Sequence, residues 1–189
     1  MTPTTLVRAG VLPIAVAFAT LVAPVGPGAP TEALAAGSSS KPSDAAAKCK
    51  RGQVYSKRRK RCVRDDSASL TSDDRFETGR AMAYAGRYED ALTVLASADV
   101  LDKRVLNYMG FASRKAGRVD EAMGYYQAAL SIDPDYTLAR SYMGQALVNE
   151  GDAAGAREQL ARIEAVKGKL NVEYAELRTA MERAGMAAR

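Results

Sequence analysis

The two cysteines are the side chains of this sequence with the clearest chemical meaning. Cys49 and Cys62 are the only cysteines, and the chain has no histidine. Two thiolates cannot complete the tetrahedral shell of a zinc ion, and their spacing is far from the Cys-x-x-Cys arrangement of a redox centre. In an oxidising compartment the simplest chemistry for the pair is a disulfide, so we predict a Cys49–Cys62 bridge and no metal site.

A dense run of positive charge lies between the cysteines. Residues 48–64 contain nine lysines and arginines and no acid, and five of them are consecutive: Lys57, Arg58, Arg59, Lys60 and Arg61. Such a patch attracts anionic polymers or an anionic membrane surface. The alternative is a charge run that only adds solubility. The run also fits a nuclear localisation signal, but sequence-specific nucleic-acid binding is not expected, because no recognised motif accompanies it.

The groups that usually carry catalysis are missing from the sequence. It has no histidine, no nucleophile elbow and no glycine-rich phosphate loop, so acid–base and covalent catalysis lack their usual members. Carboxylates such as Asp73, Asp74, Asp133 and Asp135 stand at predicted helix starts, where they favour the helix dipole. We therefore expect neither an enzyme nor a cofactor.

Residues 1–35 have the pattern of a cleaved secretory signal peptide. Arg8 precedes an uncharged apolar run over residues 11–22, and Ala33-Leu34-Ala35 supplies a small-x-small cleavage pattern. Prolines and glycines after the run argue against a continuous membrane span. We expect a periplasmic or secreted bacterial protein with no stable membrane span after cleavage. The alternative is an uncleaved N-terminal anchor.

The rest of the chain divides into three parts. Residues 36–47 are small and polar, and they predict a flexible linker. Residues 48–64 predict a short hairpin or loop, closed by the disulfide, that displays its basic charges outward. Residues 70–187 predict a helical domain, and residues 65–189 carry 16 Lys and Arg against 20 Asp and Glu. The sequence therefore describes a basic loop in front of a mildly acidic body.

A repeat of thirty-four residues organises the helical domain. Tyr108-Met109-Gly110 returns as Tyr142-Met143-Gly144, and a fixed period of this length indicates a helical-repeat array. Thr71 and Asp74 have the spacing of a capping box that starts the first helix. Glycines mark the turns between helices, so we predict helix pairs at 73–85 and 88–98, 104–116 and 119–131, and 138–150 and 153–166, with a final helix at 171–185.

These residues resemble the tetratricopeptide repeat. The middle repeat matches best, through Leu106, Met109, Gly110, Gly117, Ala122, Tyr126, Ala129, Leu130 and Pro134. The third repeat is a good copy, whereas the first is degenerate and its link to the second is shortened. The resemblance implies an all-α fold: a right-handed superhelical stack of about three helix-turn-helix repeats with a C-terminal capping helix.

The family binds its partners on the concave surface that the first helices line. At the matching positions this chain has Phe76, Arg80, Tyr84, Asn107, Phe111, Arg114, Lys115, Ser141, Gln145 and Asn149. The resemblance implies a partner protein or peptide there, and the basic and amide side chains suit an acidic one. The alternative is an ordinary solvated helix face. Phe111 is expected to be free for binding, because the repeat does not use its position for core packing.

Two functions remain for the whole chain. The first is a non-catalytic protein-binding module of the bacterial cell envelope, which binds a partner segment in its concave face. The second is an envelope-polymer binder that uses residues 48–64 to hold an anionic polysaccharide, lipopolysaccharide or a membrane surface, with the repeats as a spacer or oligomerisation unit.

Overall fold

The computed structural model describes residues 42–187. The predicted signal peptide and residues 36–41 of the predicted linker lie outside the described residues. Within the described part, eight helices and one two-stranded sheet follow one another along the chain: α1 (Asp44–Ala47), β1 (Gln53–Ser56), β2 (Arg61–Arg64), α2 (Ser72–Tyr84), α3 (Tyr88–Leu95), α4 (Lys103–Lys115), α5 (Val119–Ile132), α6 (Thr137–Asn149), α7 (Ala153–Lys167) and α8 (Val172–Arg183). The predicted all-α fold class is confirmed, with a small hairpin added in front.

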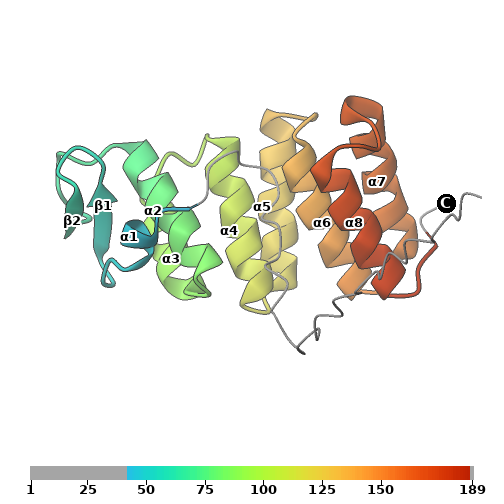
Figure 1. Ribbon diagram of the computed structural model, residues 1–189, viewed down its shortest axis with the longest axis horizontal. Coiled ribbons are helices and arrows are strands. Elements are labelled where there is room, and N and C mark those ends of the chain that lie inside the picture. The colour runs from blue at the N-terminus through green and yellow to red at the C-terminus, as the bar shows by residue number, and fades with distance from the viewer. Residues whose placement is uncertain (1–41, 188–189) are drawn as a thin grey trace, which may run out of the picture. The chain divides into compact units, whose positions relative to one another are not determined.

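Helices α2 to α7 form three packed pairs that are stacked in chain order (Figure 1). The pairs are α2 with α3, α4 with α5, and α6 with α7, as the repeat predicts. The predicted capping box is present, since the Asp74 amide donates to Thr71 Oγ1 and the Thr71 amide donates to an Asp74 carboxylate oxygen. Only α3 is clearly shorter than expected. It ends at Leu95, and Ser97 just beyond it donates a hydrogen bond to Asp65.

Glycine is required at the turn inside each pair. Gly86, Gly117 and Gly151 have φ of +78°, +84° and +83°, a left-handed conformation that a side chain disfavours. Each glycine ends one helix and lets the next begin two residues later with reversed direction. The recurring glycines therefore set the antiparallel pairing of the repeats.

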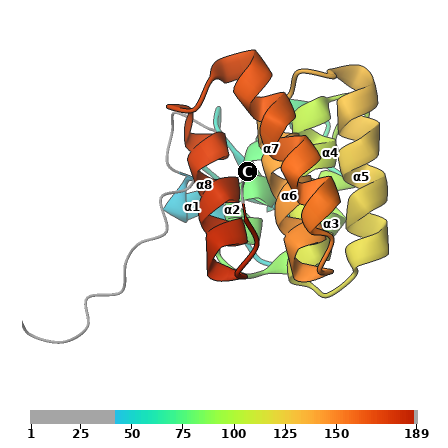
Figure 2. The ribbon, with the colours of Figure 1, turned by 90° about the vertical axis from the view of Figure 1, so that its right-hand side faces the viewer.

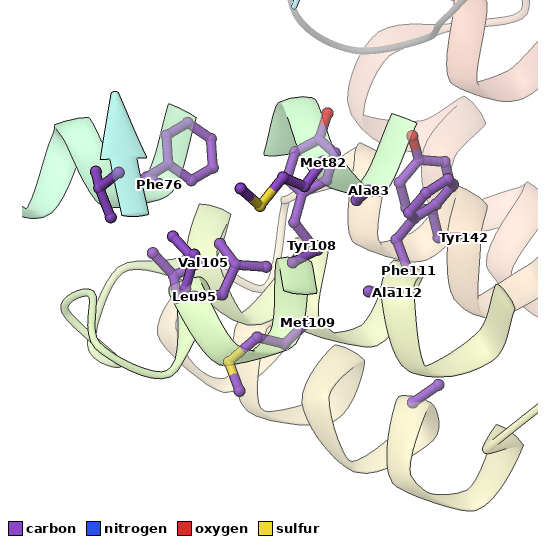
Figure 3. Packing of buried hydrophobic residues seen from close by; sticks show 14 of the residues in the cluster. Phe76, Met82, Ala83, Leu95, Val105, Tyr108, Met109, Phe111, Ala112 and Tyr142 are labelled. Atoms are coloured by element: carbon purple, nitrogen blue, oxygen red, sulfur yellow. The ribbon is translucent and has the colours of Figure 1, made fainter. Parts of the chain in front are cut away.

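A second glycine lets the helices of a pair approach closely. A Cβ atom on Gly110 would lie 2.5 Å from the Tyr126 ring, and one on Gly79 would lie 2.5 Å from Leu95. Both partner side chains are buried in the core and come from the second helix of the same pair. Figure 3 shows part of this core, in which side chains of successive pairs interdigitate.

The basic segment is part of the folded array and not a separate loop. Its β1 and β2 strands pair in antiparallel register, and the Cys49–Cys62 disulfide closes them with a Cα–Cα distance of 5.5 Å. Val54 is fully buried against the first repeat, and the Tyr55 amide donates to Thr78 Oγ1 of α2 at 3.0 Å. We name α1, β1 and β2 the N-terminal cap, because they cover the free face of the first pair (Figure 1).

Residues 44–47 therefore differ from the predicted flexible linker. They form α1, which Ser43 caps by accepting a hydrogen bond from the Ala46 amide. Arg87 fixes the segment from the array, because its Nη1 donates to the carbonyls of Ala47 at 2.6 Å and Cys49 at 2.7 Å. Polar contacts with backbone carbonyls order this short segment, although its side chains are small.

The α8 helix covers the other end of the stack. Figure 2 views this end, where α8 lies beside α6 and α7. Leu177 of α8 packs directly on Gly144, where a Cβ would approach it to 2.5 Å. Tyr174 and Met181 are buried with it, whereas Arg178 and Glu182 on the outer face are exposed. An apolar inner face and a charged outer face are what a terminal repeat needs to end an array.

Candidate functional site

Five aromatic rings from the three first helices meet where the binding surface is predicted, and all of them except Tyr84 are buried. We name them the aromatic floor: Phe76, Tyr84, Tyr108, Phe111 and Tyr142. Adjacent rings have centroids 5.2 to 6.5 Å apart, mostly in tilted or edge-to-face arrangements, which is the range in which aromatic pairs attract. The rings come from α2, α4 and α6, so the floor joins all three repeats (Figure 3).

The burial of Phe111 contradicts the prediction from the sequence. The sequence predicts that it is free for binding, but it is only 8% exposed and belongs to the central core cluster. Tyr84 and Tyr142, from the repeats on either side, enclose its ring at centroid distances of 5.6 and 5.2 Å. The position becomes a core position because large rings from the two neighbouring repeats converge on it.

The tyrosine hydroxyls of the floor also meet. The Tyr84 hydroxyl oxygen lies 3.0 Å from that of Tyr108 and 3.3 Å from that of Tyr142. Arg80 Nε donates to the Tyr108 hydroxyl at 3.3 Å. Burial raises the pKa of Tyr108 and of Tyr142 well above the ordinary value for a tyrosine. The hydroxyls of Tyr108 and Tyr142 therefore stay protonated at neutral pH and act as neutral donors and acceptors.

Cationic side chains lie over or beside the aromatic floor. The Arg104 guanidinium carbon lies 4.4 Å from the Phe76 ring centroid, and that of Arg114 lies 5.9 Å from both Phe111 and Tyr142. The Lys115 ammonium lies 6.0 Å from Phe111. These distances allow cation–π attraction. We name Arg104, Arg114 and Lys115 the cationic rim.

Two members of the rim have no counter-charge. Within residues 42–187, neither Arg114 nor Lys115 forms an ion pair, and the charged hydrogen bond of Arg114 goes to the neutral Gln145 oxygen at 3.3 Å. Partial burial lowers the pKa of Lys115, and the neighbouring Arg114 lowers it further. A carboxylate placed between the two side chains would relieve this repulsion.

Helix α4 also carries buried polar atoms without hydrogen-bond partners among the described residues. The Asn107 side chain is fully buried, and neither its amide nitrogen nor its oxygen has a hydrogen-bond partner within the described residues. Arg114 Nε is in the same state. An unpaired buried donor or acceptor costs about 1–3 kcal/mol.

The remaining predicted groove residues differ in how far they are buried. Arg80 is 2% exposed and is held by Tyr108 and by an ion pair with Glu77 at 3.1 Å. Gln145 is half-buried beside Arg114, and Asn149 is exposed at the end of α6. Arg104 and the floor tyrosines Tyr108 and Tyr142 were missing from the predicted site. The thirty-four-residue spacing of the two tyrosines was a signal that could have indicated equivalent positions in successive repeats.

The basic run lies at the hairpin turn of the N-terminal cap. Lys57 to Lys60 form the turn between β1 and β2, and Arg61 starts β2. All five side chains are exposed. Lys57 alone among them forms an ion pair within the described residues, with Asp73 at 2.6 Å. We name these five residues the basic tip.

The comparison with protein families agrees with this architecture. The model of the tetratricopeptide repeat matches residues 113–181, from the end of α4 into α8. The match and the three stacked helix pairs support a tetratricopeptide repeat protein. Repeats of this family generally mediate protein–protein interaction, which fits a non-catalytic binding module. No curated protein matches the chain.

Proposed function

We propose that the protein binds an acidic segment of another protein against the aromatic floor and the cationic rim. The observation that carries this proposal is the pair Arg114 and Lys115, two adjacent cations at the end of α4 that form no ion pair within residues 42–187. Charge-assisted hydrogen bonds from such groups are the strong contacts available to a bound carboxylate.

The chemistry of the floor supports a peptide more than a small molecule. Its rings run continuously from α2 to α6, and Tyr84 is the partly exposed ring among them. An extended segment could pass over several repeats at once, with an apolar side chain against Tyr84 and carboxylates at the rim. We place this activity outside the cytoplasm, as an exported protein of the bacterial envelope, on the strength of the signal-peptide pattern in residues 1–35.

Photo-crosslinking in cells tests the groove. A photoreactive phenylalanine analogue at position 149, which is exposed at the end of α6 and leaves both cations in place, is expected to capture a discrete partner, and the Arg114→Gln substitution should reduce the yield about tenfold or more. The matched control carries the analogue at Arg162, which is exposed on α7. Equal capture at both positions, or capture that is unaffected by Arg114→Gln, would refute the groove as the binding surface.

The intact mass of the protein recovered from the cell envelope tests its export separately. We expect a mass that lacks residues 1–35, and a mass that includes them would contradict cleavage. The same sample with and without reductant reports whether Cys49 and Cys62 are joined, because a disulfide is two hydrogens lighter than the thiol pair.

A further inference from the structure

We infer that the basic tip and the neighbouring α3–α4 loop form a docking surface for an anionic lipid membrane. This surface adjoins the cationic rim at Arg104 but uses other residues, and the inference does not rest on the proposed peptide-binding function. Four cations of the tip, Arg58, Arg59, Lys60 and Arg61, are exposed and form no ion pair within residues 42–187.

Exposed aliphatic side chains lie on the same edge of the array as the tip. Val100 and Leu101, in the α3–α4 loop, are 51% and 76% exposed. The loop is held to the start of α2, because the Asp99 amide donates to Ser72 Oγ at 2.7 Å. Figure 1 shows the β1–β2 turn and the α3–α4 loop on one edge of the stack.

A shared carboxylate connects the loop to the tip. Asp73, at the start of α2, forms an ion pair with Lys57 of the tip at 2.6 Å and with Arg104, just after the loop, at 3.5 Å. The Lys57 amide is also fixed, since it donates to an Asp74 carboxylate oxygen at 3.0 Å. The tip and the loop are therefore held in a defined arrangement by α2.

Cations beside exposed aliphatic groups favour a membrane over other polyanions. At a lipid surface, lysine and arginine bind the headgroups while aliphatic side chains enter the acyl boundary. A hydrated polysaccharide offers nothing to Leu101. Single-stranded nucleic acid favours aromatic side chains for stacking, and the only aromatic residue of the hairpin, Tyr55, is half-buried.

The backbone of the turn adds an independent observation. Lys60 has φ of 53°, and it is the only residue other than glycine with a positive φ among the described residues. Glycine would adopt this left-handed conformation without the steric cost that a lysine bears. The turn thus keeps a positive charge at a position where the conformation alone favours glycine.

The substitution Lys60→Gly tests membrane binding and is not expected to lower the stability of the fold. The substitution removes one charge from the tip, so partitioning onto vesicles with 30% phosphatidylglycerol should fall about fivefold. Because it also relieves the left-handed conformation, the melting temperature should stay equal or rise. Arg183→Gln, which removes one exposed charge at the end of α8, is the matched control and should partition as the parent chain does.

The full chain is cosedimented with vesicles at low salt. The quantity compared is the ratio of its partitioning onto anionic vesicles to its partitioning onto phosphatidylcholine vesicles. This ratio cancels any apolar contribution of residues 1–35, which act on both lipids. A ratio of one for the parent chain, or equal losses in Lys60→Gly and Arg183→Gln, would overturn the inference.

A fluorescent reporter distinguishes lipid insertion from polyanion binding. The chain contains no tryptophan, so Leu101→Trp introduces a single one. We expect its emission to shift to shorter wavelength with anionic vesicles and to stay unchanged with heparin or single-stranded DNA at the same charge concentration. Leu170→Trp, in the fully exposed loop before α8, is the control and should not shift. An unshifted Leu101→Trp on bound vesicles would overturn the lipid assignment and leave plain polyanion binding.

Discussion

Reduction of the Cys49–Cys62 disulfide is expected to destabilise the entire helical array. The disulfide closes a loop with a sequence separation of 13, and loop-closure entropy for such a loop amounts to about 3 kcal/mol. For a fold of about 150 residues, 1 kcal/mol changes the melting temperature by about 3 °C. Since Val54 and Cys49 are buried in the same core cluster as the first repeat, we expect the helices to melt about 9 °C lower in reductant.

Far-ultraviolet circular dichroism measures this effect, because its signal reports the helices of the array. Cys49→Ala/Cys62→Ala is the control, and it should melt at the lower temperature with or without reductant. An unchanged melting temperature of the parent chain in reductant would show that the hairpin unfolds independently. The N-terminal cap would then contribute nothing to the stability of the repeats.

The close helix contacts and the titrating groups allow three further predictions. Gly110→Ala should lower stability by about 1–2 kcal/mol in urea unfolding, because its Cβ would lie 2.5 Å from the buried Tyr126 ring; Gly124→Ala, with open space around it, should be neutral or stabilise by up to about 1 kcal/mol. Hydrogen bonding to Arg87 lowers the pKa of Asp90. The free energy of unfolding should therefore fall as the pH drops below about 4, where this carboxylate becomes protonated in the unfolded chain. Asp90→Asn should reduce this pH dependence. Burial raises the pKa of Tyr126 to about 12. The stability that the neutral Tyr126 side chain contributes is complete below a pH of about 10 and is lost as the pH rises through its pKa in the folded state. Tyr126→Phe should weaken this loss of stability, measured by alkaline unfolding.

The helices of the array were predictable because local rules determine them. The spacing of apolar residues determines which face of each helix is buried. Glycines such as Gly117 end a helix where the backbone adopts a left-handed conformation. The observed bounds of the array helices agree with the predicted ones to within one to three residues at each end. The close contact at Gly110 also follows from the sequence, since only glycine leaves room for the Tyr126 ring.

The N-terminal cap and the aromatic floor were not predictable in the same way. The cap has little apolar surface, and it is held by contacts such as the Tyr55 amide with Thr78 and Arg87 with backbone carbonyls, which no periodic pattern reveals. The burial of Phe111 depends on how far each repeat rotates relative to the next. That rotation brings rings of non-adjacent repeats together, and the spacing within one repeat does not define it.

The hydroxyl contact between Tyr84 and Tyr142 has a consequence for how the protein unfolds. These residues belong to the first and third repeats, 58 positions apart in the chain. Solenoids are ordinarily one-dimensional, with each unit bound only to its nearest neighbours, so that an end can fray while the rest stays folded. In this protein the first and third repeats also contact each other, through the hydroxyls of Tyr84 and Tyr142. Unfolding of the first or the third repeat must therefore break a contact with the other, which favours a single all-or-none transition of the three repeats over their stepwise loss.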